Sequence, residues 1–160
     1  MRAELCHWQS EDVDALARLE SAASPHGWSR QALEQASLAP KRLRLAMVSE
    51  GHWLAHAVFS FVADEAELLI ISVHPAHRGQ GLAQALIRAA IDELGPTINS
   101  VFLELRASND AAKALYNKLG FSLCGRRKNY YRSGVADGRR EDALLMRLDL
   151  KQARANTERV

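Results

Sequence analysis

Residues 73–83, Val73-His74-Pro75-Ala76-His77-Arg78-Gly79-Gln80-Gly81-Leu82-Ala83, decide how the rest of the chain is interpreted. They follow an apolar run at 67–74, which predicts a buried central strand, and they lead into a helical apolar pattern at 82–94. Gly79 and Gly81 let the backbone bend and approach a ligand without a Cβ clash. Free N–H groups and the dipole at the start of a helix attract anions, so this stretch predicts a phosphate or pyrophosphate site.

The same loop lacks the features of two common phosphate-binding motifs. No Gly-Lys-Ser/Thr follows it, so it is not a P-loop, and it lacks the third glycine of the G-x-G-x-x-G dinucleotide motif. The loop by itself leaves a second interpretation open, a glycine-rich strand-to-helix turn that binds nothing.

Outward from this loop, the sequence alternates between strand and helix patterns. Leu43, Leu45 and Met47 alternate with polar residues, which predicts a half-buried strand at 42–50. Ser10 is the expected N-cap of the first helix, and Ser29 that of the second. The predicted order, β-α-α-β-β-β-α-β-α-β-β, implies an α/β (α+β) mixed sheet with helices on both faces. Strands are expected at 3–7, 42–50, 53–62, 67–74, 101–106, 121–131 and 142–150, and helices after residue 10, at 29–37, at 82–94 and from 110 to Gly120.

Length and composition describe an ordinary globular protein. The chain has 160 residues, of which 48% are hydrophobic and 25% charged, and its formal net charge is +2. One domain over 1–150 is expected, followed by a flexible polar tail at 151–160. The balanced charge indicates neither a sequence-specific nucleic-acid partner nor a membrane. The longest aliphatic run, Leu68–Ile71, is far shorter than the ~18 residues of a membrane helix.

The cysteine and histidine pattern predicts an intracellular protein without a metal. Cys6 and Cys124 cannot form a disulfide scaffold, and we expect buried thiols in a reducing cytoplasm. His74 and His77 are separated by Pro75, and no cysteine pair or acidic ligand lies at zinc spacing, so no metal site is expected.

The segment Arg78-x-x-Gly81-x-Ala83 resembles the Gln/Arg-x-x-Gly-x-Gly/Ala motif of the GNAT acyltransferase superfamily, which binds the pyrophosphate of acetyl-CoA. Residues 102–109, Phe-Leu-Glu-Leu-Arg-Ala-Ser-Asn, are similar to one branch, the bacterial ribosomal-protein-alanine N-acetyltransferases, with Leu105 in place of Val. The resemblance covers nearly the whole chain. Further matches lie at Pro25–Ser29, Asp64–Ala66, Ala114–Tyr116, Leu119–Phe121, Arg127–Tyr131 and Asp137–Ala143.

The resemblance implies a fold and a co-substrate. The fold is that of the GNAT acyl-CoA N-acyltransferases, a mostly antiparallel, splayed sheet, and the co-substrate is acetyl-CoA. A backbone N–H near Val73 would bind the acetyl carbonyl, and the strand before it would lie along the pantetheine. The implied coenzyme-binding residues are Ile71, Ser72, Val73, Arg78, Gly79, Gln80, Gly81, Leu82, Ala83, Gln84 and Asn109.

The resemblance also implies a base and an acid. Glu104 would be the general base, acting through a water, and Tyr116 the general acid that protonates the coenzyme A thiolate. The residues by themselves leave simpler roles open: Glu104 as a solvated strand carboxylate paired with Arg106, Tyr116 as an aromatic core residue, and Asn109 as a plain helix cap. Tyr116 follows Asn109 by seven residues, close to two helical turns, so both are expected on one helix face.

The resemblance predicts acetyl transfer to the α-amino group of a protein N-terminus, above all the N-terminal alanine of a ribosomal protein. An α-amine with a pKa near ~8 is partly neutral at pH 7, whereas a lysine near ~10.4 is almost fully charged, which favours the α-amine. The alternatives are a lysine or small-molecule amine as acceptor, or a catalytically silent coenzyme- or RNA-binding module. The basic cluster of Arg126–Lys128, Arg132 and Arg139–Arg140 is either a solvated sheet edge or a contact with coenzyme phosphates or ribosomal RNA.

Overall fold

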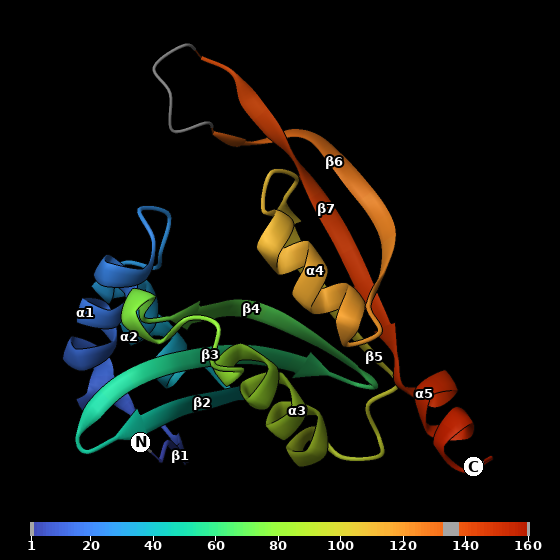
Figure 1. The fold of residues 1–160 in the computed structure, drawn as a ribbon, viewed down its shortest axis with the longest axis horizontal. Helices are drawn as coiled ribbons and strands as arrows, with labels where there is room; N and C mark the ends of the chain where they lie inside the picture. Colours follow the sequence, from blue (N-terminus) through green and yellow to red (C-terminus); the bar gives the residue numbers. More distant parts are fainter. Residues whose placement is uncertain (1, 133–137, 160) are drawn as a thin grey trace. The chain divides into compact units, whose positions relative to one another are not determined.

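The computed structural model describes residues 2–132 and 138–159 and confirms the predicted α/β fold. Its seven strands form a mostly antiparallel sheet in the order β1-β2-β3-β4-β5-β7-β6 (Figure 1). The strands are β1 Glu4–His7, β2 Arg42–Ser49, β3 His52–Val62, β4 Glu65–Val73, β5 Ser100–Arg106, β6 Ser122–Arg132 and β7 Arg140–Asp149. The helices are α1 Val13–Ala23, α2 Arg30–Leu38, α3 Leu82–Leu94, α4 Asp110–Lys118 and α5 Leu150–Thr157, with short 3₁₀ turns at Ser10–Asp12 and Pro75–His77.

The described residues fall into two compact units. The first holds the chain up to Val62 together with Leu68–Thr97, and the second holds Ala63–Glu67 and the chain from Ile98 onward. A single domain over 1–150 remains a prediction. Each unit carries part of the residues that the sequence singled out.

In the first unit, helices cover both faces of the antiparallel strands β2 and β3, whereas the edge strand β1 is largely exposed. Ala46 of β2 and Val58 of β3 pack with α1 and α2 around the fully buried Trp8. The neighbouring Leu45 and Ala57, which point to the opposite face, are also fully buried, and α3 packs against β2 and β3. The predicted strand at 42–50 is confirmed as β2, with Leu43 and Leu45 buried and Arg42 and Arg44 less so, but its second face is more covered than predicted, since Ala46 is also fully buried.

The helix starts of this unit follow local hydrogen bonding. Ser29 caps α2 as predicted, its Oγ accepting a bond from the Ala32 N–H at 3.1 Å. The predicted cap at Ser10 was wrong: the chain makes a 3₁₀ turn there, and the Gln9 N–H donates to Asp12 Oδ2 at 2.8 Å. Residues 82–94 form α3 as predicted, with Leu86, Ile87 and Ala90 buried.

In the second unit, β7 pairs antiparallel with β5 on one side and with β6 on the other. Figure 1 shows β6 and β7 running together as a long twisted ribbon. Val101, Leu103 and Leu105 are buried, as the alternation in β5 predicted. α4 ends at Lys118, two residues before Gly120, whose φ of +96° is the left-handed conformation expected of a glycine after a helix.

The C-terminal segment, expected to be a polar tail, contains a helix. Leu150–Thr157 forms α5, capped by Asp149 Oδ1, which accepts from the Gln152 N–H at 3.1 Å. The flexibility of the tail remains a prediction.

Both cysteines are free thiols, as predicted, but Cys124 is exposed rather than buried. Burial, followed by the charge of Asp12, raises the pKa of the Cys6 thiol.

None of the helices in the described part of the chain is both long and apolar enough to span a bilayer.

Candidate active site

The glycine-rich loop leaves an exposed helix N-terminus in the first unit. The loop leaves β4, makes the 3₁₀ turn at Pro75–His77 and enters α3 through Gly81. Gly79 and Gly81 have φ values of +76° and +79°, and a Cβ at either position would meet no atom within 4 Å. The loop thus has the left-handed backbone that favours glycine, and open space where side chains would otherwise stand.

The start of α3 lacks the side-chain cap that three other helices have; α1, which follows directly on a 3₁₀ turn, also lacks one. Side chains cap α2, α4 and α5, through Ser29, Asn109 and Asp149 respectively. The N-cap of α3 is Gly81, which provides no side-chain bond. The first N–H groups of a helix have no intrahelical acceptor, so those of α3 can bind an anion.

Arg78 and Ser72 tie this loop and strand to α1. The Arg78 Nη2 donates to the Ala23 carbonyl oxygen at 2.5 Å, at the C-terminal end of α1. Hydrogen bonding from the Ser72 side chain lowers the pKa of the carboxylate of Glu20, also on α1. The strand residues Leu69–Val73 are only half-buried, although they are among the most apolar of the chain.

The second unit holds Glu104 among basic and aromatic side chains. Glu104 retains 23% of its side-chain exposure, and its Oε1 lies 3.2 Å from Nη2 of Arg127. Burial, followed by the negative charge of Glu104, raises the pKa of Tyr131. The neighbouring Tyr130 is 47% exposed, and the guanidinium of Arg127 lies 5.3 Å from the centre of its ring. An acidic group, a cation and two phenols therefore lie together on one ribbon of strands.

The sequence left open an ion pair between Glu104 and Arg106, and this interpretation was wrong. Arg106 instead bonds Glu141 Oε1 and the Arg132 carbonyl oxygen, each at 3.0 Å. Arg106 and Arg127 both lie opposite Ala143, on either side of β7. Spacing along one strand cannot reveal a partner that comes from two strands away.

Asn109 and Tyr116 lie at the two ends of α4. The Oδ1 of Asn109 accepts from the Ala112 N–H at 3.1 Å, so the predicted role as a helix cap is confirmed. Tyr116 is 6% exposed and its ring lies 5.7 Å from that of Phe121. Burial raises the pKa of Tyr116 to about 12, so its phenol stays protonated at neutral pH.

The predicted site residues are thus divided between the units. The first unit carries Ile71, Ser72, Val73 and the loop residues Arg78–Gln84, and the second carries Glu104, Asn109 and Tyr116. Sequence reasoning missed the partners Arg127 and Glu20. Among the described residues, no group of three or more His, Cys, Asp or Glu side chains is arranged to hold a metal ion.

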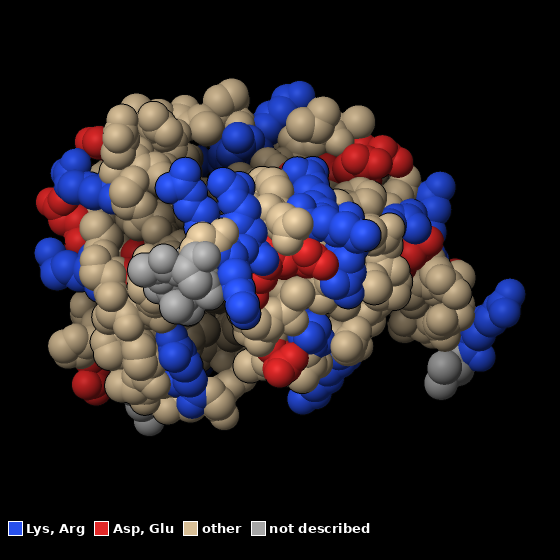
Figure 2. Space-filling view, turned by 90° about the horizontal axis from the view of Figure 1, so that it is seen from above, with Lys and Arg blue, Asp and Glu red and all other residues tan. Residues whose placement is uncertain are grey.

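The basic cluster of the ribbon is partly neutralised by ion pairs. Arg126 Nη1 lies 2.8 Å from Asp142 Oδ2, in addition to the contact of Arg127 with Glu104. Figure 2 shows groups of Lys and Arg side chains with carboxylates between them.

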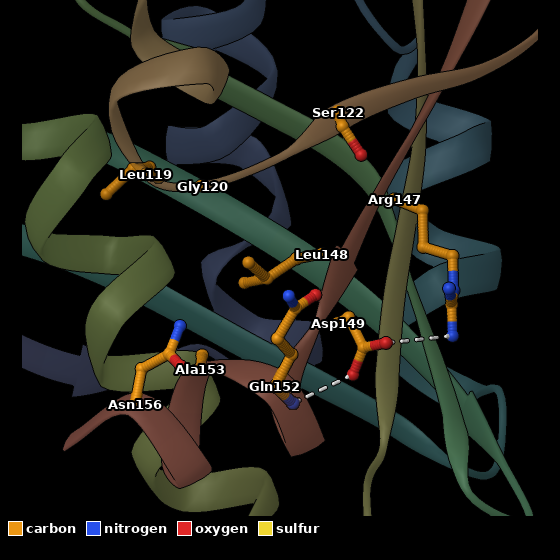
Figure 3. Close-up of a pocket in the computed structure, with 9 residues that line it drawn as sticks. All are labelled: Leu119, Gly120, Ser122, Arg147, Leu148, Asp149, Gln152, Ala153 and Asn156. Carbon is orange, nitrogen blue, oxygen red and sulfur yellow. Dashed lines mark hydrogen bonds and ion pairs between the residues drawn. The ribbon is translucent and has the colours of Figure 1, made fainter. Parts of the chain in front are cut away.

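A pocket of about 310 Å³ lies elsewhere in the second unit (Figure 3). It is lined by residues of β7, α5 and the turn at Leu119–Gly120, and Arg147 and Asp149 lie 3.7 Å apart beside it. It includes none of the residues predicted from the sequence to form the active site. We therefore do not assign the acyl-transfer chemistry to it.

Comparisons with known proteins agree with this geometry. A model of the acetyltransferase (GNAT) family matches residues 8–121. The ribosomal protein bS18-alanine N-acetyltransferase of Escherichia coli K12 is 37% identical over 143 residues, which are 89% of this chain and 94% of that protein. A putative enzyme of the same name from Bacillus subtilis 168 is 30% identical over 147 residues, 91% of this chain and 94% of that protein.

Solved structures show the same fold. The crystal structure of the ribosomal-protein-S18-alanine N-acetyltransferase from Escherichia coli has a TM-score of 0.84 at 36% identity and covers 93% of this chain and 94% of its own. Arabidopsis thaliana NAA60 in complex with acetyl-CoA has a TM-score of 0.82 at 16% identity, with coverage of 94% and 99%, and supports the fold alone. The chain belongs to the GNAT family of acetyltransferases.

Proposed function

We propose that this chain transfers acetyl from acetyl-CoA to the α-amino group of the N-terminal alanine of ribosomal protein bS18, in the cytoplasm. The observation that carries the proposal is the start of α3, which lacks a side-chain cap and is reached through two glycines with open space beside them. The relatives that match nearly the full length of the chain are named for this reaction, which supports the choice of acceptor.

In this proposal the first unit binds the donor. The N–H groups from Gly79 to Gln84 bind the pyrophosphate, with the helix dipole favouring its negative charge. Residues Ile71–Val73 lie along the pantetheine, and the Val73 N–H binds the acetyl carbonyl. Asn109 contributes from α4 through Nδ2, because its Oδ1 already caps the helix.

The second unit supplies the acid and the base. Glu104 removes a proton from the amine through a water, the amine nitrogen bonds to the acetyl carbon, and the C–S bond breaks. Tyr116 donates its proton to the departing thiolate. A phenol with a pKa of about 12 is a weaker acid than a thiol of ~8.5, so this transfer must accompany C–S cleavage. The guanidinium of Arg127 contacts the Glu104 carboxylate and keeps it in position.

The acceptor is tested with three synthetic peptides. We expect coenzyme A release with a peptide that begins with alanine, and none with the same peptide when its N-terminus is blocked and only a lysine amine is free. Turnover on the lysine alone would replace the N-terminal proposal with a lysine acetyltransferase. A peptide beginning with proline controls for general amine reactivity, and absence of turnover with every amine would indicate a silent module.

The glycine loop predicts a selective loss of donor binding. Gly81→Ala should raise the KM for acetyl-CoA by about tenfold or more, because a Cβ would occupy the space assigned to the pyrophosphate. Gly51→Ala is a matched control: Gly51 has a φ of +78° and equally open surroundings, but lies in a β-turn. Steady-state kinetics at fixed peptide concentration measures both, and an equal rise of KM in the two variants would count against the loop.

We expect loss of the proposed base, Glu104, to slow the chemical step. Glu104→Gln should lower kcat by about 10²–10⁴-fold, the usual contribution of general acid–base catalysis, with little change in the KM for acetyl-CoA. Glu93→Gln is the control, since Glu93 is also a paired carboxylate, in contact with His7 on the surface. A Glu104→Gln enzyme with more than half of the wild-type kcat would exclude the assigned role.

The proposed role of Tyr116 as the acid predicts how kcat depends on pH. Tyr116→Phe should lower kcat by about 10²-fold. Because the pKa of Tyr116 is about 12, the wild-type kcat should rise with pH as the amine loses its proton and should not fall by loss of the Tyr116 proton up to about pH 10. Rate profiles between pH 6 and pH 10 measure this. A fall near pH 10 that Tyr116→Phe abolishes would contradict the burial of this phenol.

A further inference from the structure

Glu20 is a charged side chain in the core of the first unit that the proposed chemistry does not use. It is 1% exposed and lies on α1, beside the apolar cluster that contains Trp8 and Leu16. Burial by itself would raise the pKa of Glu20, but hydrogen bonds from His56 and Ser72, the charge of His56 and the Trp28 N–H outweigh it and lower the pKa. The group is therefore an ionised carboxylate, which can only accept hydrogen bonds.

Three donors from three different segments converge on this carboxylate. His56 Nε2 of β3 lies 2.5 Å from Oε1. The Trp28 N–H, just before α2, donates to Oε2 at 3.0 Å. The Ser72 side chain, near the end of β4, is the third group, and its hydrogen bonding lowers the pKa of the Glu20 carboxylate. Glu20, on α1, thus faces three other segments: β3, the turn before α2, and the residue of β4 that precedes Val73.

The turn between α1 and α2 is built around this carboxylate. A Cβ at Gly27 would collide with Glu20 Oε2 and would lie 3.1 Å from the Glu20 carbonyl oxygen. Three residues after Glu20, the Ala23 carbonyl oxygen accepts from Arg78 of the glycine loop. The C-terminal end of α1 therefore contacts both the residues proposed to bind the donor and the turn at Pro25–Trp28.

A buried ion pair is weak evidence for stability, because desolvation opposes the attraction between the charges. An apolar side chain could fill the same space within this cluster, but it could not hold three donors at fixed positions. His56 Nδ1 is buried and has no hydrogen-bond partner in the described part of the chain, so Glu20 is the group that orients this ring.

We propose that Glu20 is a positioning residue for acetyl transfer, which holds Ser72 against the donor and fixes the Pro25–Trp28 turn relative to it. The inference rests on the proposed function, because it takes Ser72 as a donor contact. All three groups that face Glu20 are donors. The amide NH₂ of a glutamine at this position would meet one of them, so Glu20→Gln keeps the side-chain shape and disrupts the arrangement.

Donor binding and backbone exchange test the proposal together. Glu20→Gln should raise the Kd for acetyl-CoA by about tenfold, as loss of a hydrogen bond to a charged group does, and should speed hydrogen exchange of the Trp28 amide. Val13→Ala is the matched control: Val13 is buried on the same helix, two turns away, and bonds to none of the three segments. It should lower the melting temperature without raising the Kd.

A double variant separates positioning from general destabilisation. If Glu20 acts through Ser72, adding Glu20→Gln to Ser72→Ala should change the Kd by less than about twofold. The proposal is overturned if Glu20→Gln leaves the Kd and the Trp28 exchange rate unchanged, or if Val13→Ala raises the Kd equally. If the wild-type chain does not bind acetyl-CoA, the proposed function fails, while the exchange rate of the Trp28 amide still decides whether Glu20 fixes the turn.

Discussion

The start of α3 has no side-chain cap, and the proposed donor site depends on its N–H groups staying accessible. The left-handed backbone at Gly79 and Gly81 brings the chain from β4 into the helix without a Cβ on the approach. Leu86, Ile87 and Ala90 then anchor the helix on β2 and β3, so its N-terminus does not depend on a cap for its position. Packing on one face of the helix thus allows exposed N–H groups at its end.

The second unit, which is proposed to supply the acid and the base, places these two side chains in different environments. Glu104 keeps partial exposure and a cationic neighbour, Arg127, which suits the role of base proposed for it. Tyr116 is almost fully buried beside Phe121, and burial keeps its proton in place until a strong base forms next to it. In the proposed mechanism the partly exposed carboxylate serves as base and the buried phenol as acid.

The sequence predicted those features that depend on neighbours close along the chain. The glycine-rich turn from β4 into α3, the bounds of α3, the cap at Asn109 and the alternation of β5 were confirmed, because caps, turns and periodicity act within one or two turns. The contact of Glu104 with Arg127 depends on register across two strand pairs, and that of Glu20 with His56 depends on how α1 crosses the sheet. Local spacing in the sequence specifies neither strand register nor the packing angle of a helix, so only the structure identifies these partners.

The two cysteines differ in a way that has a practical consequence. Cys6 is half-buried with a raised pKa, whereas Cys124 is exposed on the outer strand β6. Thiol chemistry depends on the thiolate form and on access, so maleimide reagents at neutral pH should modify Cys124 first. The natural sequence therefore already provides one attachment point for a fluorophore, on the strand that carries Tyr130, and no engineered cysteine is needed to observe what binds there.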